Sequence, residues 1–225
     1  MPLLSPVGTG LYTLAEAARL ARVSPARVRG WIVGYRGRAA PILRRQYRDD
    51  GGPPVLGFLD LIEVRFVRAL ADRGVSRQSL RIAAERARAV IGHDHPFANA
   101  RFRTDGRRIF LETRDETGDR RLLDLLADNF AIYDVLERSF RDGLDFDADG
   151  VARRWRPVAE LDRIVVDPAR AFGRPIDEAS GVPADVLADA LAAEGDVRRV
   201  ADWYRVDPAA VTQAAALRSS LARAA

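Results

Sequence analysis

Arginine is concentrated near the start of this sequence of 225 residues. Between Tyr12 and Arg48 there are nine arginines and a single acidic residue, Glu16. A guanidinium group is planar and can bind a phosphate or the edge of a guanine with two hydrogen bonds. The clustering therefore predicts contact with DNA, although a solvated basic face on a small helical domain would give the same composition. The residues expected to make these contacts are Ser24, Arg27, Arg29, Arg36, Arg38, Arg44 and Arg45.

Two short helices joined by a tight turn are expected to hold these side chains. Thr13 and Glu16 have the spacing of a capping box, which satisfies free amides at the start of a helix over residues 14–21. Ser24 and Pro25 begin a second helix, because serine caps a helix and proline suits its first position. In a helix-turn-helix this second helix enters the major groove of DNA. Its core-facing residues are predicted to be Val28, Trp31, Ile32 and Tyr35.

The residues that follow alternate between strand and helix signals. Residues 42–47 and 55–58 are strand candidates separated by a loop rich in glycine and proline, and together they would form a β-wing. Asp105-Gly106 lies between alternating residues and predicts a hairpin turn. A surface loop is expected over the aspartate-rich residues 142–151. Helices are expected over residues 59–71, from the Ser76 cap to residue 91, and over residues 122–139.

The C-terminal part, from about residue 163, is expected to be a compact helical unit. Residues 205–211 repeat the pattern of residues 22–28, a capping residue followed by proline at a helix start. This repeat is either a common way to begin a helix or a second helix-turn-helix. Because its second helix has no positive charge, we expect this unit to contact protein rather than DNA. The helix starts are predicted at Pro183, Asp196 and Asp207.

The N-terminal part resembles the winged helix-turn-helix of MerR-like regulators. The resemblance lies in Tyr12 to Ala18, the turn at Ser24-Pro25, the wing, residues 58–63 and Arg73 to Ser76, and it spans roughly residues 11–91. It implies DNA binding through the second helix and the wing. Two features depart from the family. The chain lacks the thiolates of MerR-type metal sensors, and a hairpin is expected where the family has a long dimerisation helix.

The C-terminal part resembles a second family, the domain of unknown function 433, over about residues 161–217. The similarity lies in residues 164–168, 172–176, 182–183 and 197–204, whereas Ala179-Ser180-Gly181 replaces the usual Gly-Thr-Arg. That family occurs in VapB-like antitoxins, which are often encoded beside toxins of the PIN nuclease fold. The resemblance implies that an arginine of this chain enters the acidic, metal-binding active site of such a toxin. The candidate residues for partner binding are Arg174, Arg218 and Arg223.

Other kinds of chemistry have little support in the sequence. The absence of cysteine excludes disulfides, thiolate metal sites and cysteine nucleophiles. His93 and His95 have no third ligand, so a polar loop is expected there rather than a metal site. The aspartates of residues 142–151 lack the glutamate that completes a calcium loop, and no nucleotide-binding glycine loop or serine elbow occurs. We expect no catalysis, cofactor or metal. Trp155 is expected to pack at the domain junction, with the arginines beside it solvated.

These patterns predict a mainly α protein with small β-hairpins, of the α+β class. Its expected parts are a winged helix-turn-helix over residues 1–95, a hairpin-and-helix connecting region over 96–158, and a small helical interaction domain resembling a helix-turn-helix over 159–225. The sequence has no apolar run long enough to cross a membrane and no secretory signal at its start, so a cytoplasmic protein is expected.

The two resemblances together are typical of two-domain VapB-type antitoxins. Such a protein would bind the promoter DNA of its own operon as a homodimer and would also bind and neutralise a PIN-like ribonuclease toxin. One alternative is a stand-alone MerR-like transcriptional regulator that responds to a small ligand. Another is a dimerising protein whose basic face is incidental.

Overall fold

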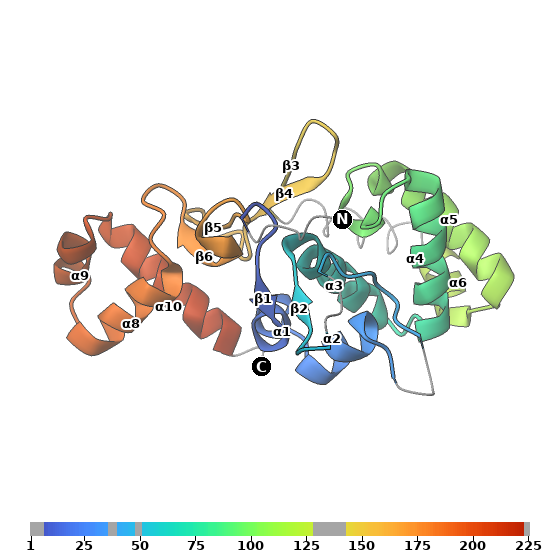
Figure 1. Ribbon diagram of the computed structural model, residues 1–225, viewed down its shortest axis with the longest axis horizontal. Helices are drawn as coiled ribbons and strands as arrows, with labels where there is room; N and C mark the ends of the chain where they lie inside the picture. The colour runs from blue at the N-terminus through green and yellow to red at the C-terminus, as the bar shows by residue number, and fades with distance from the viewer. Residues whose placement is uncertain (1–6, 36–39, 48–50, 128–142, 223–225) are drawn as a thin grey trace.

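The computed structural model describes residues 7–35, 40–47, 51–127 and 143–222. Helices of residues 77–127 lie at one end of the molecule and helices of residues 184–222 at the other, with the N-terminal helices between them (Figure 1). In the described part of the chain, a two-stranded and a four-stranded antiparallel sheet accompany these helices. The predicted α+β class is therefore confirmed.

The N-terminal helix-turn-helix forms as its capping residues predict. Helix α1 runs over Leu14–Ala21, and α2 runs over Pro25–Ile32. The Thr13 hydroxyl accepts a hydrogen bond from the amide of Glu16, and the Glu16 carboxylate accepts one from the amide of Thr13 at 2.8 Å. This is the expected capping box. Helix α3, Phe58–Ala71, packs against α1.

The expected β-wing does not form from residues 42–47 and 55–58. Strand β2, Val55–Leu56, pairs with β1, Tyr12–Thr13, which directly precedes α1. Residues 41–47 contain no strand, because the amides of Ile42 and Leu43 both donate to one carbonyl at the end of α2, at 2.8 and 3.0 Å. These two neighbours are both buried, so the segment lacks the alternation of a half-buried strand.

The helical end of the molecule contains α4, η1, α5 and α6. Residues 102–117 form one helix, so the hairpin predicted from Asp105-Gly106 is wrong. Their buried residues recur every three or four positions, and burying that helical face outweighs the local turn preference of Asp-Gly. The predicted helix over residues 122–139 is described only to Ala127, and the rest of it lies outside the described residues. The elements are α4, Arg77–Ile91; η1, Pro96–Ala98; α5, Phe102–Thr117; and α6, Arg120–Ala127. The buried residues of α5 include Phe102, Gly106, Ile109, Phe110 and Thr113.

A four-stranded sheet follows, with its strands in sequence order. Within the described part of residues 142–151, residues 144–146 form a strand that pairs with residues 152–155, so the expected loop is largely a hairpin. The Asp147 carboxylate accepts the amides of Asp149 and Val151 at 3.0 and 2.8 Å, which closes the hairpin turn. The sheet has strands on both sides of the expected boundary at residue 158, and the three-part division stays a prediction. The strands are β3, Leu144–Phe146; β4, Ala152–Trp155; β5, Ile164–Val166; and β6, Pro175–Asp177.

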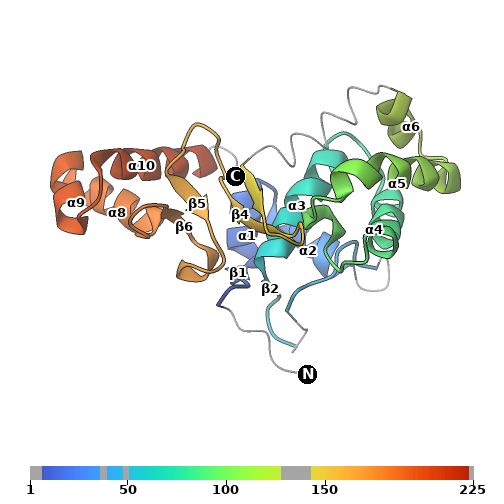
Figure 2. The same ribbon diagram turned by 90° about the horizontal axis from the view of Figure 1, so that it is seen from above.

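The described C-terminal residues form helices whose starts agree with the sequence. The Asp196 carboxylate accepts the amides of Arg198 and Arg199, as expected of a cap. Figure 2 shows α10 extending from α9 back toward α1, where a guanidinium nitrogen of Arg22 donates to the Ser220 hydroxyl at 2.7 Å. The helices are α8, Ala184–Glu194; α9, Val197–Tyr204; and α10, Pro208–Ala222.

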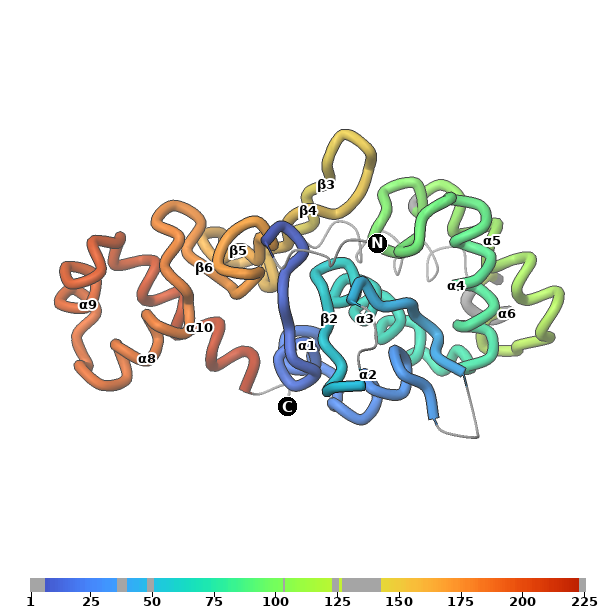
Figure 3. Tube along the Cα trace, viewed as in Figure 1, coloured from blue at the N-terminus to red at the C-terminus, as the bar shows by residue number. Residues whose placement is uncertain are grey.

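Residues 8–12, which we call the strap, join the two halves of the molecule. The Leu11 amide and the Tyr12 hydroxyl donate to carbonyls within residues 168–173 at 2.9 and 2.8 Å. On its other side, the Thr9 carbonyl accepts the first amide of α3 at 2.8 Å. The trace in Figure 3 shows the strap between the loop before β6 and strand β2. The C-terminal half is thus hydrogen-bonded directly to the helix-turn-helix.

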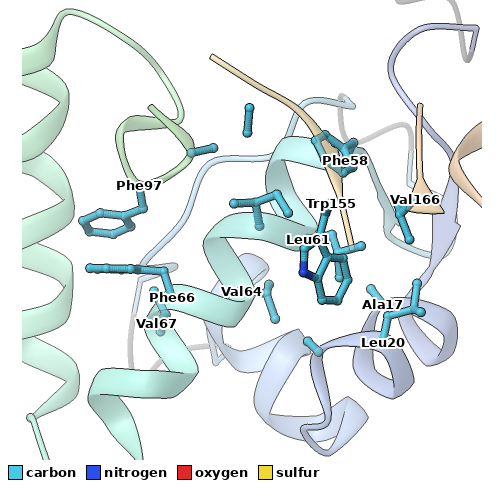
Figure 4. Packing of buried hydrophobic residues seen from close by; sticks show 14 of the residues in the cluster. Ala17, Leu20, Phe58, Leu61, Val64, Phe66, Val67, Phe97, Trp155 and Val166 are labelled. Atoms are coloured by element: carbon cyan, nitrogen blue, oxygen red, sulfur yellow. The ribbon is translucent and has the colours of Figure 1, made fainter. Parts of the chain in front are cut away.

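Buried aromatic residues form the centre of the core (Figure 4). Trp155 of β4 is 2% exposed and lies between α1 and α3, which confirms the expectation that it packs at the junction. Of the arginines expected to be solvated beside it, Arg153 is exposed, whereas Arg154 and Arg156 form ion pairs. Arg154 is 3.2 Å from both Asp167 and Glu178, and Arg156 is 2.9 Å from Glu178.

Candidate nucleic-acid interface

The turn between α1 and α2 orients the predicted DNA-contacting helix. Arg22 adopts a left-handed conformation, with φ 54° and ψ 48°, and the Val23 amide donates back to the Ala18 carbonyl at 3.0 Å. Ser24 is exposed and its hydroxyl accepts the Arg27 amide at 3.4 Å, a long hydrogen bond that leaves the first turn of α2 open to solvent. The predicted cap is therefore confirmed, and its position suits contact with an anion.

Helix α2 has a buried and an exposed face. Tyr35 does not face the core as expected but is 49% exposed, because α2 ends three residues before it. Its ring instead covers Gly30, where a Cβ would lie 2.3 Å from the tyrosine hydroxyl. Gly30 is therefore required for this packing. The other core positions of α2 are buried as predicted: Val28, Trp31 and Ile32.

Arg27 is held in place on the exposed face. Its guanidinium is 2.9 Å from the Asp72 carboxylate and lies over the Trp31 ring, 5.1 Å from the centroid. Asp72 also pairs with Arg68 at 3.1 Å. Because 44% of the Arg27 side chain remains exposed, it can still reach a phosphate or base, but it would share or leave Asp72 to do so.

Arg29 points toward a hollow of about 790 Å³ beside α2. Within the described residues it makes no ion pair and no side-chain hydrogen bond. Arg45, from the segment that follows α2, lines the same hollow, so two of the predicted contact residues are brought together. A concave surface bordered by two guanidinium groups suits a phosphate backbone.

Of the other predicted DNA-contacting arginines, the structure describes only Arg44. Arg44 is exposed and forms an ion pair with Asp94. Arg36 and Arg38 lie outside the described residues. DNA contact by any residue of the predicted set stays a prediction.

A buried cluster of Asp60, Glu63 and His95 supports the segment that carries Arg44 and Arg45. The Asp60 carboxylate accepts the amides of Gln46 at 3.0 Å and Gly57 at 2.8 Å, and thereby fixes residues 46 and 57 to α3. Nδ1 of His95 is 3.3 Å from Glu63 and 3.6 Å from Asp60. Sequence patterns do not indicate this contact, which joins residues more than thirty positions apart. Residues 93–95 form the expected polar loop, in which His95 is buried.

The cluster has perturbed ionisation. Burial raises the pKa of Asp60 to about 6, although the charge of His95 and the amides of Gly57 and Gln46 oppose that shift. Burial alone would lower the pKa of His95, but the hydrogen bond and charge of Glu63 outweigh it, and the pKa is raised. The cluster is structural, because the side chains of Asp60 and Glu63 on α3 and of His95 are all buried.

Two of the candidate partner-binding residues lie beside α1, where they line a hollow together with Glu16 and Arg19. Arg174 forms an ion pair with Asp185, and Arg218 is 2.5 Å from Asp189 and donates to the Asp185 carbonyl. Both arginines line a hollow of about 180 Å³ between α1 and the C-terminal helices. Arg223 lies outside the described residues.

The C-terminal junction repeats the backbone of the first. Arg205 has φ 54° and ψ 45°, and the Val206 amide donates to the Ala201 carbonyl at 3.0 Å. The two dihedral angles and the hydrogen-bond length closely match those of the turn at Arg22. Asp207 takes the place of Ser24 and caps α10 by accepting the Ala209 amide at 2.8 Å. The expected helix–turn–helix geometry at residues 205–211 is confirmed.

The described part of the chain has neither a metal-binding cluster nor a membrane-spanning helix. There, no three histidine or acidic side chains come together in a way that could hold a metal ion. No helix in those residues combines the length and apolar character needed to cross a bilayer.

The described elements define an α+β protein that carries a helix-turn-helix junction in each half. No protein-family model matches the sequence. The chain is 29% identical over 216 residues to a protein of Mycobacterium tuberculosis named "Putative antitoxin VapB45", covering 88% of this chain and 89% of that protein. The structure is similar to the crystal structure of Rv2018 from the same organism, with a TM-score of 0.71, 25% identity, and coverage of 90% of this chain and 96% of the other.

Proposed function

We propose that the protein is the antitoxin of a type II toxin–antitoxin pair, a cytoplasmic regulator with no catalytic role. The observation that carries the proposal is the similarity to a protein named as an antitoxin, which extends over 88% of this chain rather than over one domain. A similarity of that extent covers the basic helix-turn-helix and the C-terminal unit together. The proposal therefore assigns a role to each half.

The first role is binding of the operon's own promoter by a homodimer through α2. It is supported by the exposed arginines on α2 and beside it and by the open N-terminal turn at Ser24. In this role Arg29 contacts base edges or phosphates, and Arg27 exchanges Asp72 for DNA. Arg44 and Arg45 hold the flanking backbone.

The second role is neutralisation of a PIN-like ribonuclease by insertion of an arginine into its acidic active site. Arg174 and Arg218 support this role, because each is partly exposed and already pairs with a carboxylate of its own chain. When such an arginine exchanges its internal carboxylate for one on the toxin, the guanidinium group stays paired. Its charge is then not left without a partner when the complex buries it. Arg223 is the third candidate.

Co-expression tests this proposal. A gene encoding a PIN-like nuclease beside this one is expressed from an inducible promoter, with and without this chain, and growth is followed. Rescue of growth and co-purification of the two proteins are expected. The Arg174→Ala, Arg218→Ala double variant is expected to lose rescue, whereas Arg27→Ala, Arg29→Ala should retain it because its changes lie on the DNA-binding helix. Failure of the unaltered chain both to rescue growth and to co-purify overturns the proposal.

A further inference from the structure

A group of large aromatic side chains is left open at the end of α9. Trp203 is 60% exposed and Tyr204 is 37% exposed. Charged residues surround them on the same helix and on the turn that follows. We call this surface the α9 face; its residues are Arg198, Asp202, Trp203, Tyr204, Arg205 and Asp207, all of them exposed.

The first helix-turn-helix shows what normally covers this position. Because Arg22 and Arg205 occupy the same place in the two turns, Leu20 corresponds to Trp203 and Ala21 to Tyr204. Leu20 is only 5% exposed and Ala21 only 2% exposed.

Their cover comes from α3 and from Trp155. An Arg68 guanidinium nitrogen of α3 donates to the Ala21 carbonyl at 3.0 Å, and Trp155 lies beside Leu20 in Figure 4. Within the described residues, nothing comparable covers the α9 face, which lies at the far end of the molecule from α4 in both Figure 1 and Figure 2. The same motif is thus complete at one site and lacks its covering element at the other.

The residue types suit a protein partner better than nucleic acid. Tryptophan, tyrosine and arginine are the side chains that most often contribute strongly to protein–protein binding. Asp202 and Asp207 would repel a phosphate backbone, and the first turn of α10 carries no cation.

The charges favour a second copy of this chain. Arg198, Asp202, Arg205 and Asp207 alternate in sign along the α9 face, and none of the first three forms an ion pair within the described residues. A two-fold axis presents one face to an identical face in the reverse direction, so alternating charges can pair with one another while the aromatic rings meet at the centre. A partner of a single charge sign would match only half of these residues.

We propose that the α9 face is the homodimer interface of this protein, with Trp203 and Tyr204 at its centre and the other copy in the place that α3 and Trp155 occupy at the first junction. The inference rests on the homodimer in the proposed function and names the surface that forms it. It is independent of toxin binding, which is assigned to other residues.

Sedimentation equilibrium across a dilution series of the full-length chain tests the interface. The unaltered chain is expected to have twice the mass of the 24.8 kDa monomer and to dissociate on dilution. The Trp203→Ala, Tyr204→Ala double variant is expected to raise the dimer dissociation constant by roughly 30-fold or more, because two central aromatic anchors are lost. The control is Phe172→Ala, which removes an aromatic ring that is 54% exposed elsewhere and should leave the constant unchanged. A monomeric unaltered chain, or a double variant that associates as strongly, overturns the inference.

Cross-linking gives a second measurement in which the aromatic residues are intact. Because the sequence has no cysteine, Asp202→Cys introduces a single thiol on the α9 face, and Gln78→Cys introduces one on the exposed surface of α4. A short bis-maleimide is expected to link two copies of the first variant and not of the second. Equal linking of both, or linking of neither, contradicts the proposed interface. Growth rescue by a chain that dimerises elsewhere would leave the antitoxin proposal standing and refute only this inference.

Discussion

The two helix-turn-helix junctions share a backbone and differ in almost everything around it. Both turn through a left-handed arginine, both return an amide to the carbonyl five residues earlier, and both begin the next helix with a cap and a proline. The first carries Arg27 and Arg29 on its second helix, whereas the corresponding positions of α10 are Ala210 and Thr212. Helix α3 packs across α1 at the first junction. At the second junction the corresponding surface of α9 is exposed at Trp203 and Tyr204.

This difference separates what local sequence encodes from what the surroundings decide. The turn needs only a cap, a proline and a residue that tolerates a positive φ, and these recur in both places. Which molecule the junction can meet depends on charges and on covering elements contributed by distant parts of the chain. Four experiments test how far the two junctions differ, from the largest expected effect to the smallest.

The largest contrast should be in DNA affinity. We expect the Arg27→Ala, Arg29→Ala variant to bind the promoter at least about 30-fold more weakly, since each arginine contact contributes about 1–3 kcal/mol. The control at the second junction is Thr212→Ala, at the exposed position of α10 that corresponds to Arg29, and it should leave affinity unchanged. Fluorescence anisotropy at fixed salt measures both, with circular dichroism to confirm folding. Equal losses at the two junctions would show that α2 is not the recognition helix.

The second contrast is in the pH dependence of stability. Because the Asp60 pKa is about 6 in the folded protein and 3.8 ordinarily, the folded state holds more protons between those values. The free energy of unfolding should therefore fall as pH rises from about 4 to 6, by an amount on the order of 2 kcal/mol. The raised pKa of His95 extends the fall above its ordinary value of 6.5. Urea denaturation at a series of pH values measures this slope.

A variant distinguishes the buried cluster from the rest of the chain. Asp60→Asn should flatten the slope between about pH 4 and 6 and lower stability overall, because the new amide group cannot accept both amide hydrogen bonds. Asp202→Asn, on the exposed second junction, should leave the slope as it was. An unchanged slope in Asp60→Asn would mean that another group is responsible.

The third contrast is between the two helix caps. The Ser24 hydroxyl accepts the Arg27 amide at 3.4 Å. The Asp207 carboxylate accepts the Ala209 amide at 2.8 Å and also lies 3.7 Å from the guanidinium group of Arg163. Removal of a cap costs about 1 kcal/mol, so Asp207→Ala should lower stability by about this amount and Ser24→Ala by less. Thermal denaturation of both variants gives the order, and a larger loss for Ser24→Ala would reverse it.

The smallest contrast is at the two left-handed arginines. Glycine adopts a positive φ without strain, so Arg205→Gly should raise the stability of the monomer by up to about 1 kcal/mol. Arg22→Gly should gain less, because it also removes the hydrogen bond to Ser220. Chemical denaturation of both variants is the measurement, and an equal gain at both sites would indicate that the Ser220 contact contributes nothing.

The sequence predicted best the features that depend on neighbouring residues. The capping box at Thr13, the cap at Ser24 and the repeat at residues 205–211 all lie where local patterns placed them. The hairpin at Asp105-Gly106 was wrong, because a strong local turn signal was overridden by aromatic burial along α5, where Phe102 and Phe110 pack with ring centroids 5.8 Å apart.

The long-range contacts that position the candidate site are the features that the sequence predicts least well. Nothing near Asp60 indicates that His95 approaches it, and the pairing of β2 with β1 rather than with residues 42–47 depends on where α1 begins. The exposed arginines could be anticipated from composition alone. The contacts that position them, such as Arg27 with Asp72, join segments whose proximity only the fold determines.

The strap also has a consequence for how the chain is made. Residues 8–12 leave the ribosome well before their hydrogen-bond acceptors in residues 168–173, because about 160 residues separate the two segments. Domains tend to fold during synthesis from the N-terminus. The helix-turn-helix can therefore form while the strap has its hydrogen bond to α3 but not those to residues 168–173. A ribosome that stalls before residue 168 would thus release a chain whose Tyr12 hydroxyl lacks its native acceptor.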